Sequence, residues 1–548
     1  MKKIIVFLLV ATFALLFVAC DKNNYEEKSS KKEEETQVKA TASASASGTC
    51  GNNVTWTYDD VTGILTISGT GAMEDYKLND FYMAYCQPWD KYEDNVKKVV
   101  IDDGVTKIGD YAFKGCVNLQ DVTIGADVTT IGSYAFEDCK RLTDVTIPNS
   151  VTTIGDEIFH RCTGITSITV DSNNKYYSSD EYGVLFNKDK TTLIKYPVSN
   201  TRTSYIIPDS VTTIGSKAFE YSGRLADVTI PNSVSTIDNS AFAYCDSLTS
   251  VTIPDGVTTI DYYAFEYCSS LTSVTIPDSV TTICSYAFYS CTSLTSITIP
   301  NGVTEIGDSA FSECTSLTSI TIPDSVITIS FRAFCSCDSL ISVTIPDSVT
   351  TISDEAFIYC DNLTKITVES NNKYYSNDGY GVLFNKDKTT LIQYPTGNTR
   401  TSYTIPNSVT TIGDNAFSFC ESLTGIIIPN SVTTIGDHAF SCCESLTSII
   451  IPNSVTKIGS FAFSVCKSLT SITIPDSVTK IGMGTFVGCT SLTSVTIGDV
   501  VTIIDKRAFS NCNNLRDVYY GGTEEQWENI YIGEENTRLT DATIHYNQ

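Results

Sequence analysis

Apolar residues recur along the chain at a fixed spacing. From Ile101 to Tyr520 an Ile, Val or Tyr returns at regular intervals, and fifteen of these intervals are 23 residues long. The other two intervals, 170 to 207 and 368 to 405, are 37 residues long. A constant period of this size is typical of a solenoid, in which each unit stacks on the next.

Residues 270–291, SLTSVTIPDSVTTICSYAFYSC, show what one unit contains. Val274 and Ile276 alternate with Ser and Thr, which is the period of a strand with one buried face. Pro277 ends that strand, and two further apolar residues return to the core. The next residue is a good N-cap, Gly, Asp or Ser, in almost every unit, which predicts a short helical turn that buries an Ala-Phe pair.

A single unit of this kind has too few apolar residues to fold alone, so the units must stack. The pattern predicts an α/β solenoid over residues 96–520. Its expected features are one long parallel β-sheet, coils that are mostly 23 residues long, short helical turns on the opposite side, and a small cap at each end.

The two long units carry nearly the same insertion. The sequence of residues 171–197 returns at 369–395, and both copies predict a β-hairpin in place of the helical turn, within insertions at 171–206 and 369–404. Tyrosines on a projecting hairpin make good contact residues for a partner, although they also serve to fill the joint between coils. The candidate contact residues are Tyr176, Tyr177, Tyr182, Tyr374, Tyr375 and Tyr380.

The unit resembles the BspA-like leucine-rich repeat of bacterial surface proteins, whose consensus is C-x-x-L-x-x-I-x-I-P-x-x-V-x-x-I-G-x-x-A-F. Cys291 to Phe311 matches every named position. The flanks are similar to the modules that border such repeats, which implies an N-terminal β-rich cap at 49–95 and a C-terminal cap at 521–548. The three tryptophans lie only in these flanks, as Trp56, Trp89 and Trp527.

The N-terminal residues have the pattern of a bacterial export signal. A basic start and a 16-residue apolar run precede Cys20, which predicts a lipoprotein signal peptide at 1–19 and acylation of Cys20. The alternative is cleavage by the ordinary signal peptidase, with Cys20 incidental. Residues 20–48 are polar and small, which predicts a flexible tether.

The net charge of the chain disfavours one class of binding partner. A formal net charge of −27 and an isoelectric point near 4.4 disfavour nucleic acid, because phosphates require a basic surface. No segment after the N-terminal run is long and apolar enough to span a bilayer.

The cysteines indicate packing and not chemistry. Fourteen of the twenty occupy one repeat position, which predicts a column of buried thiols. No C-x-x-C pair of the kind found in metal sites occurs, and no His accompanies the closer pairs Cys335/Cys337 and Cys442/Cys443. Only Cys50 and Cys86 are candidates for a disulfide. His160, His438 and His545 lie far apart, and the repeated carboxylates form no unique pair. We therefore expect no catalytic residues, no cofactor and no metal site.

The exposed face of the sheet is the other candidate binding surface. In each of the eighteen strands, the residue just before the recurrent Ile, Val or Tyr occupies an equivalent position, which we call the slot. It is Thr in thirteen strands, but it is Ile427 and Ile450 in two successive coils. Exposed apolar residues in that slot predict a small contact patch.

The resemblance implies a surface protein that binds or adheres to a protein or glycan, on a host or on other bacteria. The N-terminal residues predict that it is attached to the membrane through a lipid, and we expect a monomer. Relatives of this type attach to host matrix proteins such as fibronectin and fibrinogen. A non-adhesive envelope scaffold and a surface lipoprotein that captures glycans are the alternatives.

Overall fold

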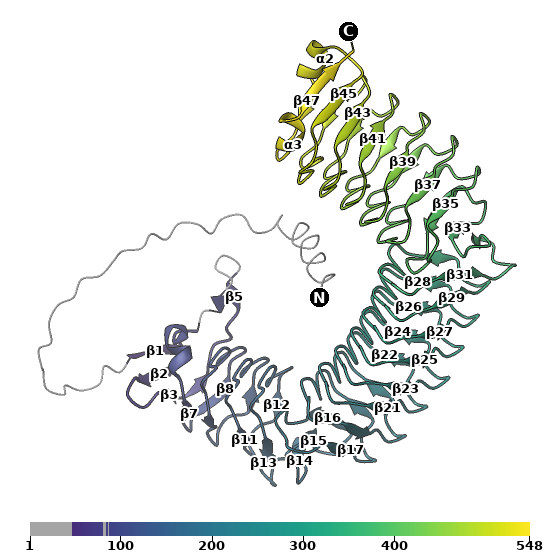
Figure 1. The fold of residues 1–548 in the computed structure, drawn as a ribbon. Coiled ribbons are helices and arrows are strands. Elements are labelled where there is room, and N and C mark those ends of the chain that lie inside the picture. Colours follow the sequence, from purple (N-terminus) through teal and green to yellow (C-terminus); the bar gives the residue numbers. More distant parts are fainter. Residues whose placement is uncertain (1–45, 80–83, 86, 548) are drawn as a thin grey trace, which may run out of the picture. The chain divides into compact units, whose positions relative to one another are not determined.

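The computed structural model describes residues 46–79, 84, 85 and 87–547 (Figure 1). The predicted signal peptide, the acylation of Cys20 and most of the tether lie outside the described residues. Cys86 is outside them as well, so its pairing with the buried Cys50 stays a prediction.

Residues from Ser45 onward form one compact unit, a solenoid of stacked coils, as predicted. Each coil places a strand on the first ladder. Strands of neighbouring coils pair in parallel within several runs of this ladder, and the register advances by one coil, as in Ser250↔Ser273. The strands of the first ladder are β7 (Lys98–Ile101), β9 (Asp121–Thr123), β11 (Asp144–Ile147), β13 (Ser167–Val170), β17 (Ser204–Ile206), β19 (Asp227–Thr229), β21 (Ser250–Thr252), β23 (Ser273–Thr275), β25 (Ser296–Thr298), β27 (Ser319–Thr321), β29 (Ser342–Ile345), β31 (Lys365–Val368), β35 (Ser402–Thr404), β37 (Gly425–Ile427), β39 (Ser448–Ile450), β41 (Ser471–Ile474), β43 (Ser494–Ile497) and β45 (Asp517–Tyr520).

The prediction of a single sheet is wrong, because each coil contributes a second, shorter strand to another parallel ladder. Pro277 and its equivalents end the first strand, and the chain then turns so that the next Val and Ile also face the core. The strands of the second ladder are β8 (Val105–Ile108), β10 (Thr130–Ile131), β12 (Thr153–Ile154), β18 (Thr213–Ile214), β20 (Thr236–Ile237), β22 (Thr259–Ile260), β24 (Thr282–Ile283), β26 (Glu305–Ile306), β28 (Thr328–Ile329), β30 (Thr351–Ile352), β36 (Thr411–Ile412), β38 (Thr434–Ile435), β40 (Lys457–Ile458), β42 (Lys480–Ile481) and β44 (Ile503–Ile504).

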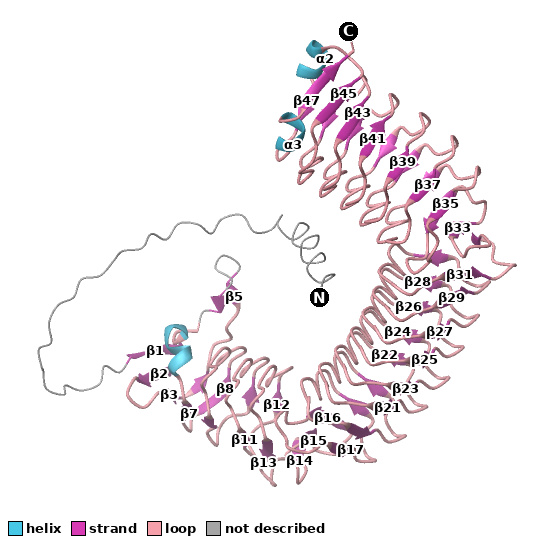
Figure 2. Cartoon of the chain, viewed as in Figure 1, coloured by secondary structure: helices cyan, strands magenta, loops and turns pink. Residues whose placement is uncertain are grey.

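The segment predicted as a helical turn is a series of tight turns instead (Figure 2). In one coil, Cys116 N donates to Phe113 O within the coil at 3.2 Å, whereas Phe113 N donates to Ala135 O of the next coil at 2.8 Å. Tyr111 and Gly115 have positive φ angles of 57° and 80°. These left-handed residues interrupt the helical path at both ends of the segment. The N–H groups of Tyr111, Phe113 and Gly115 point to the neighbouring coil, and no helix forms.

The core of the solenoid is a column of aromatic rings. The Phe residue of each coil is buried and stacks on the Phe of the next, as Phe265 does on Phe288 with ring centroids 5.4 Å apart. Tyr196 and Tyr394 take the place of Phe after the two insertions and stack on Phe219 and Phe417. The buried residues form three core clusters, which meet near the two insertions.

The N-terminal flank adds three antiparallel strands to the first ladder, where β3 pairs in parallel with β7. Trp89 is buried there, stacks on Phe113 at 5.6 Å, and meets Trp56 edge to face at 6.0 Å. The elements of this flank are β1 (Ala46–Gly51), β2 (Val54–Asp59), β3 (Ile64–Gly69), β4 (Gly71–Ala72), β5 (Leu78–Asn79), β6 (Ala84–Tyr85) and the 3₁₀ helix η1 (Asp90–Asn95).

The C-terminal flank extends both ladders by one strand. β46 (Tyr531–Ile532) pairs with β44, and β47 (Thr543–Tyr546) pairs with β45. The short helices α2 (Glu524–Glu528) and α3 (Thr537–Thr540) precede these strands, and a capping box of Thr523 and Gln526 begins α2. Trp527 packs edge to face on Tyr520 at 5.2 Å.

Each insertion forms a three-stranded antiparallel unit, which includes the hairpin that its sequence predicts. The first consists of β14 (Tyr177–Ser179), β15 (Leu185–Asn187) and β16 (Thr192–Lys195), and the second of β32 (Tyr375–Asn377), β33 (Leu383–Asn385) and β34 (Thr390–Gln393). The last strand of each unit pairs in parallel with the next coil, but the preceding coil's second strand has no ladder partner there. We call these two breaks in the second ladder the first and second hairpin joints.

Candidate functional site

The apolar slot of the first ladder is exposed where the sequence predicts it. Ile427 and Ile450 lie opposite each other on β37 and β39, and their side chains are 64% and 82% exposed. Ile206 occupies the same slot of β17 and is 74% exposed. The exposure of Ile206 was not predicted, although its place in the Thr slot is the same signal that identifies Ile427 and Ile450.

The hairpin tyrosines divide into two groups. Tyr176, Tyr374 and Tyr380 are about half exposed, as contact residues would be. Tyr182 is partly buried, and the guanidinium of Arg202 lies 3.6 Å from the centroid of its ring.

Tyr177 and Tyr375 hold the joints together. The phenol oxygen of Tyr177 accepts a hydrogen bond from Ile154 N at 2.9 Å, and that of Tyr375 accepts one from Ile352 N at 2.8 Å. These phenols take the place of the missing strand, because they satisfy an N–H at the broken edge of the ladder. Their role is structural, so they are the weakest of the six candidates for partner contact.

The cysteine column holds no reactive group. The thiol of Cys291 donates to Phe265 O of the preceding coil at 3.2 Å, and the same contact recurs in most of the coils. Every thiol of the column is buried, and burial raises the pKa of Cys314 to about 12. These cysteines therefore link coils as weak hydrogen-bond donors and are poor nucleophiles.

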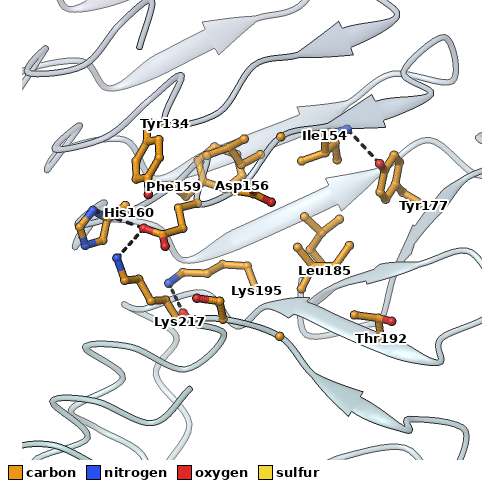
Figure 3. A pocket seen from close by; sticks show the side chains of 16 residues that line it. Tyr134, Ile154, Asp156, Phe159, His160, Tyr177, Leu185, Thr192, Lys195 and Lys217 are labelled. Carbon is orange, nitrogen blue, oxygen red and sulfur yellow. Dashed lines mark hydrogen bonds and ion pairs between the residues drawn. The ribbon is translucent and has the colours of Figure 1, made fainter. Parts of the chain in front are cut away.

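Charged side chains gather at the first hairpin joint (Figure 3). The ammonium of Lys217 lies 2.5 Å from Glu157 across the break. His160 lies between two carboxylates, with Nδ1 3.3 Å from Glu137 and Nε2 3.5 Å from Glu220. Burial opposes the charged form of His160, but its contacts with these two carboxylates outweigh burial and raise its pKa.

Lys195 comes from β16 and enters the same cluster. The residue is 8% exposed, and its Nζ donates to Lys217 O at 2.8 Å. Burial lowers the pKa of Lys195, and Glu220 opposes this shift through its charge. Lys217 and Glu157 of this cluster are 60 positions apart along the chain. Only the stacking of coils brings them together.

A hollow of about 530 Å³ opens at this joint, and we call it the Lys195 hollow (Figure 3). Its wall includes Lys195, Lys217, His160, Tyr134 and Thr192. The second joint has a space of only about 40 Å³ at the equivalent place. This hollow was not predicted from the sequence. The exchange of IKYP for IQYP between two otherwise similar copies was the available signal.

The described residues contain no group of three or more His, Cys, Asp or Glu side chains arranged to hold a metal ion. No helix among these residues has the length and apolar content needed to cross a bilayer.

Family models identify the repeat. The model described as the BspA type leucine rich repeat region matches residues 91–202, 191–314, 258–381 and 394–516. The chain belongs to the BspA-type leucine-rich repeat family. The predicted resemblance is thereby confirmed over most of the chain. A search of curated proteins gives no significant match.

Several solved structures are similar to the chain. A leucine-rich repeat protein from Eubacterium ventriosum is 29% identical over 62% of this chain and 99% of its own, with a TM-score of 0.46. A leucine rich cell surface protein from Faecalibacterium prausnitzii is 26% identical over 90% of this chain and 98% of its own, with a TM-score of 0.42. A leucine-rich repeat protein from Bacteroides ovatus is 26% identical over 68% of this chain and 98% of its own, with a TM-score of 0.45.

Proposed function

We propose that the protein is a bacterial cell-surface module that binds a macromolecular partner through the first ladder and the hairpins. The exposure of Ile427 and Ile450 is the observation that carries this proposal. Two large apolar side chains on an otherwise hydroxyl-bearing face cost solubility, and such patches mark interaction sites. Tyr176, Tyr374 and Tyr380 add aromatic contact area at the hairpins.

The surface location rests on the N-terminal sequence and on the family. Cleavage of a lipoprotein signal peptide at 1–19 would leave an acylated Cys20 at the N-terminus, and this lipid would hold the repeats at the membrane outside the cytoplasm. Replacing Cys20 with Ala should move the protein from the membrane fraction to the soluble one. Protease treatment of intact cells should release the repeat body if it faces outward, and an intact repeat body would contradict the surface location.

Binding is tested with purified protein on immobilised matrix proteins, including fibronectin and fibrinogen, and on a glycan array. The double variant Ile427→Thr, Ile450→Thr restores the residue common at this slot. It should weaken binding to whichever partner the wild type captures by at least about tenfold. Ile341→Thr is the matched control, because Ile341 is also exposed, at 55%, but lies outside the slot. Equal binding by the double variant and this control would exclude the patch as the contact surface.

A further inference from the structure

Lys195 is a buried cation without a direct counter-charge. An ammonium has three N–H donors, and only one hydrogen bond is found for Lys195 among the described residues, to Lys217 O. No carboxylate of the described residues lies within 4.0 Å of its Nζ, so Glu220 acts on Lys195 only from a greater distance. A buried charge of this kind is costly unless an anion approaches it.

The neighbouring cations already have partners. Lys217 pairs with Glu157 at 2.5 Å, and Lys114 pairs with Glu137 at 2.6 Å. Among these three lysines of the described residues, Lys195 is therefore the one without a carboxylate partner within 4.0 Å. Its side chain lines the Lys195 hollow, whose volume lies within the range of pockets that hold small ligands.

The rest of the wall selects among anions. Asp156 and Glu157 line the same hollow, so a dianion such as phosphate would meet repulsion there. An exposed carboxylate such as Asp156 accepts hydrogen bonds from hydroxyl groups, and Thr192 and Ser216 offer hydroxyls of their own. Apolar side chains complete the wall, namely those of Ile154, Leu185 and Ile194. The wall thus suits a single carboxylate attached to a polyhydroxylated ring with an apolar face.

The second joint explains why the hollow is open. Gln393 replaces Lys195, and its Nε2 donates to Phe357 O of the preceding coil at 3.0 Å. It therefore spans the gap between coils. Lys195 instead turns toward the following coil, and the gap beside Phe159, the equivalent of Phe357, stays open. The two copies of the insertion thus supply a natural pair, one with Lys195 and a hollow of about 530 Å³ and one with Gln393 and a space of about 40 Å³.

We propose that the Lys195 hollow binds an acidic sugar, with the ammonium of Lys195 against its carboxylate. The site does not depend on the adhesive surface proposed above, because it lies on the second ladder and uses none of the same residues. Its failure would leave the proposal about Ile427 and Ile450 standing.

The test is isothermal titration of the full-length protein with D-glucuronate, with D-glucose and acetate as separate arms. Glucuronate should bind saturably and much more tightly than either of the other two. Lys195→Gln installs the residue of the second copy and should weaken glucuronate binding at least about tenfold. Lys190→Gln removes the same charge from the same hairpin, outside the hollow, and should bind as the wild type does.

A second variant guards against misfolding. Thr192→Phe fills the hollow without removing a charge and should abolish binding, whereas Thr390→Phe at the second joint should leave binding unchanged. Circular dichroism verifies that each variant is folded. The proposal is overturned if the wild type does not bind glucuronate, if Lys195→Gln binds it equally well, or if acetate binds as tightly as glucuronate.

Discussion

The two hairpin joints have the same backbone plan but different chemistry. Their strands pair in the same register, as Tyr177↔Asn187 and Tyr375↔Asn385 show. Asn174 and Asn372 fix both turns in the same way, since each is fully buried and donates to two carbonyls of the preceding coil. The side chains across the break nevertheless differ. The first joint has a Lys217–Glu157 ion pair, the buried Lys195 and a hollow, whereas the second has an Arg332–Glu355 ion pair and a closed amide contact of Gln393.

This difference distinguishes the side chains that the stacking of coils requires from those that can vary. A joint requires an N–H acceptor at the broken edge, supplied by a Tyr phenol, and an aromatic ring for the core column. Both copies keep these. The positions that face across the gap are free of that requirement, because the hairpin holds the coils apart. At these positions the first joint has Lys195, Lys217 and His160. Four predictions test this view.

The largest effect is expected from exchanging Lys217 of the first joint and Asn415, its equivalent at the second joint. Lys217→Asn removes the nearest cation from the partly buried Glu157, leaves it only His160 Nδ1 at 3.9 Å among the described residues, and should lower the free energy of unfolding of the first joint by about 2 kcal/mol. Asn415→Lys at the second joint should cost less than about 1 kcal/mol, since Glu355 already pairs with Arg332 at 2.6 Å and its Oε1, which accepts from Asn415, would accept from the new ammonium. Hydrogen exchange of β18 and β36, followed by mass spectrometry in increasing urea, measures both. Equal losses at both joints would break the comparison.

The tyrosine phenols should have similar effects at the two joints. Tyr177→Phe and Tyr375→Phe each remove the acceptor of a backbone N–H, at a cost of about 1 to 2 kcal/mol. Exchange of the Ile154 and Ile352 amides should accelerate in the respective variants. Tyr176→Phe, on an exposed ring, is the control and should change neither amide. A large effect at only one joint would show that the two do not share the same structural requirement.

The cysteine column provides a third comparison. Ser222 is the exception in the column, 1% exposed, and its hydroxyl has no partner among the described residues. Ser222→Cys should stabilise the coil by about 1 kcal/mol, because a thiol is buried at a lower cost than an unpaired hydroxyl. The reverse change at the equivalent position, Cys420→Ser, should destabilise it by a similar amount. Urea denaturation monitored by tyrosine fluorescence measures both, and a destabilising Ser222→Cys would contradict the prediction.

The smallest expected effect is a pH dependence of the stability of the first joint that the second joint lacks. Because the pKa of His160 is raised above its ordinary value of 6.5, its ion pairs contribute fully below that value. Their contribution is lost as the pH rises through the raised pKa. Protection of the first joint should therefore fall by less than about 1 kcal/mol between pH 6 and pH 8, after correction for intrinsic exchange rates. His160→Ile, which installs the residue of the second copy, should remove this dependence, whereas a decline in both joints of the wild type would argue against His160.

Much of the fold follows from local patterns. The period of 23 residues, the buried Phe in each coil and the thiol column are all correctly predicted, because stacking forces equivalent residues into equivalent surroundings. The hairpins follow from alternating apolar residues around a turn. The helical turn was wrong because cross-coil hydrogen bonds compete with local ones, and a single unit cannot show that a neighbouring carbonyl, such as Ala135 O, is available.

The candidate site residues also divide into those whose exposure follows from the sequence and those whose role only the structure decided. Ile427 and Ile450 are exposed because the alternation of a strand fixes which face each residue takes. Tyr177 and Tyr375 lie on the predicted hairpins, but only the broken ladder decided that their phenols bind the backbone.

The sequence by itself determined the repeat, its core column and the faces of its strands, since these depend on residues within one coil and its identical neighbours. Only the tertiary structure decided the second ladder, the path of the turns and the Lys195 hollow. The hollow exists because Lys195 bonds to the coil that follows, whereas Gln393 bonds to the coil that precedes. That choice depends on groups 22 and 36 residues away along the chain, which become neighbours only when the coils stack.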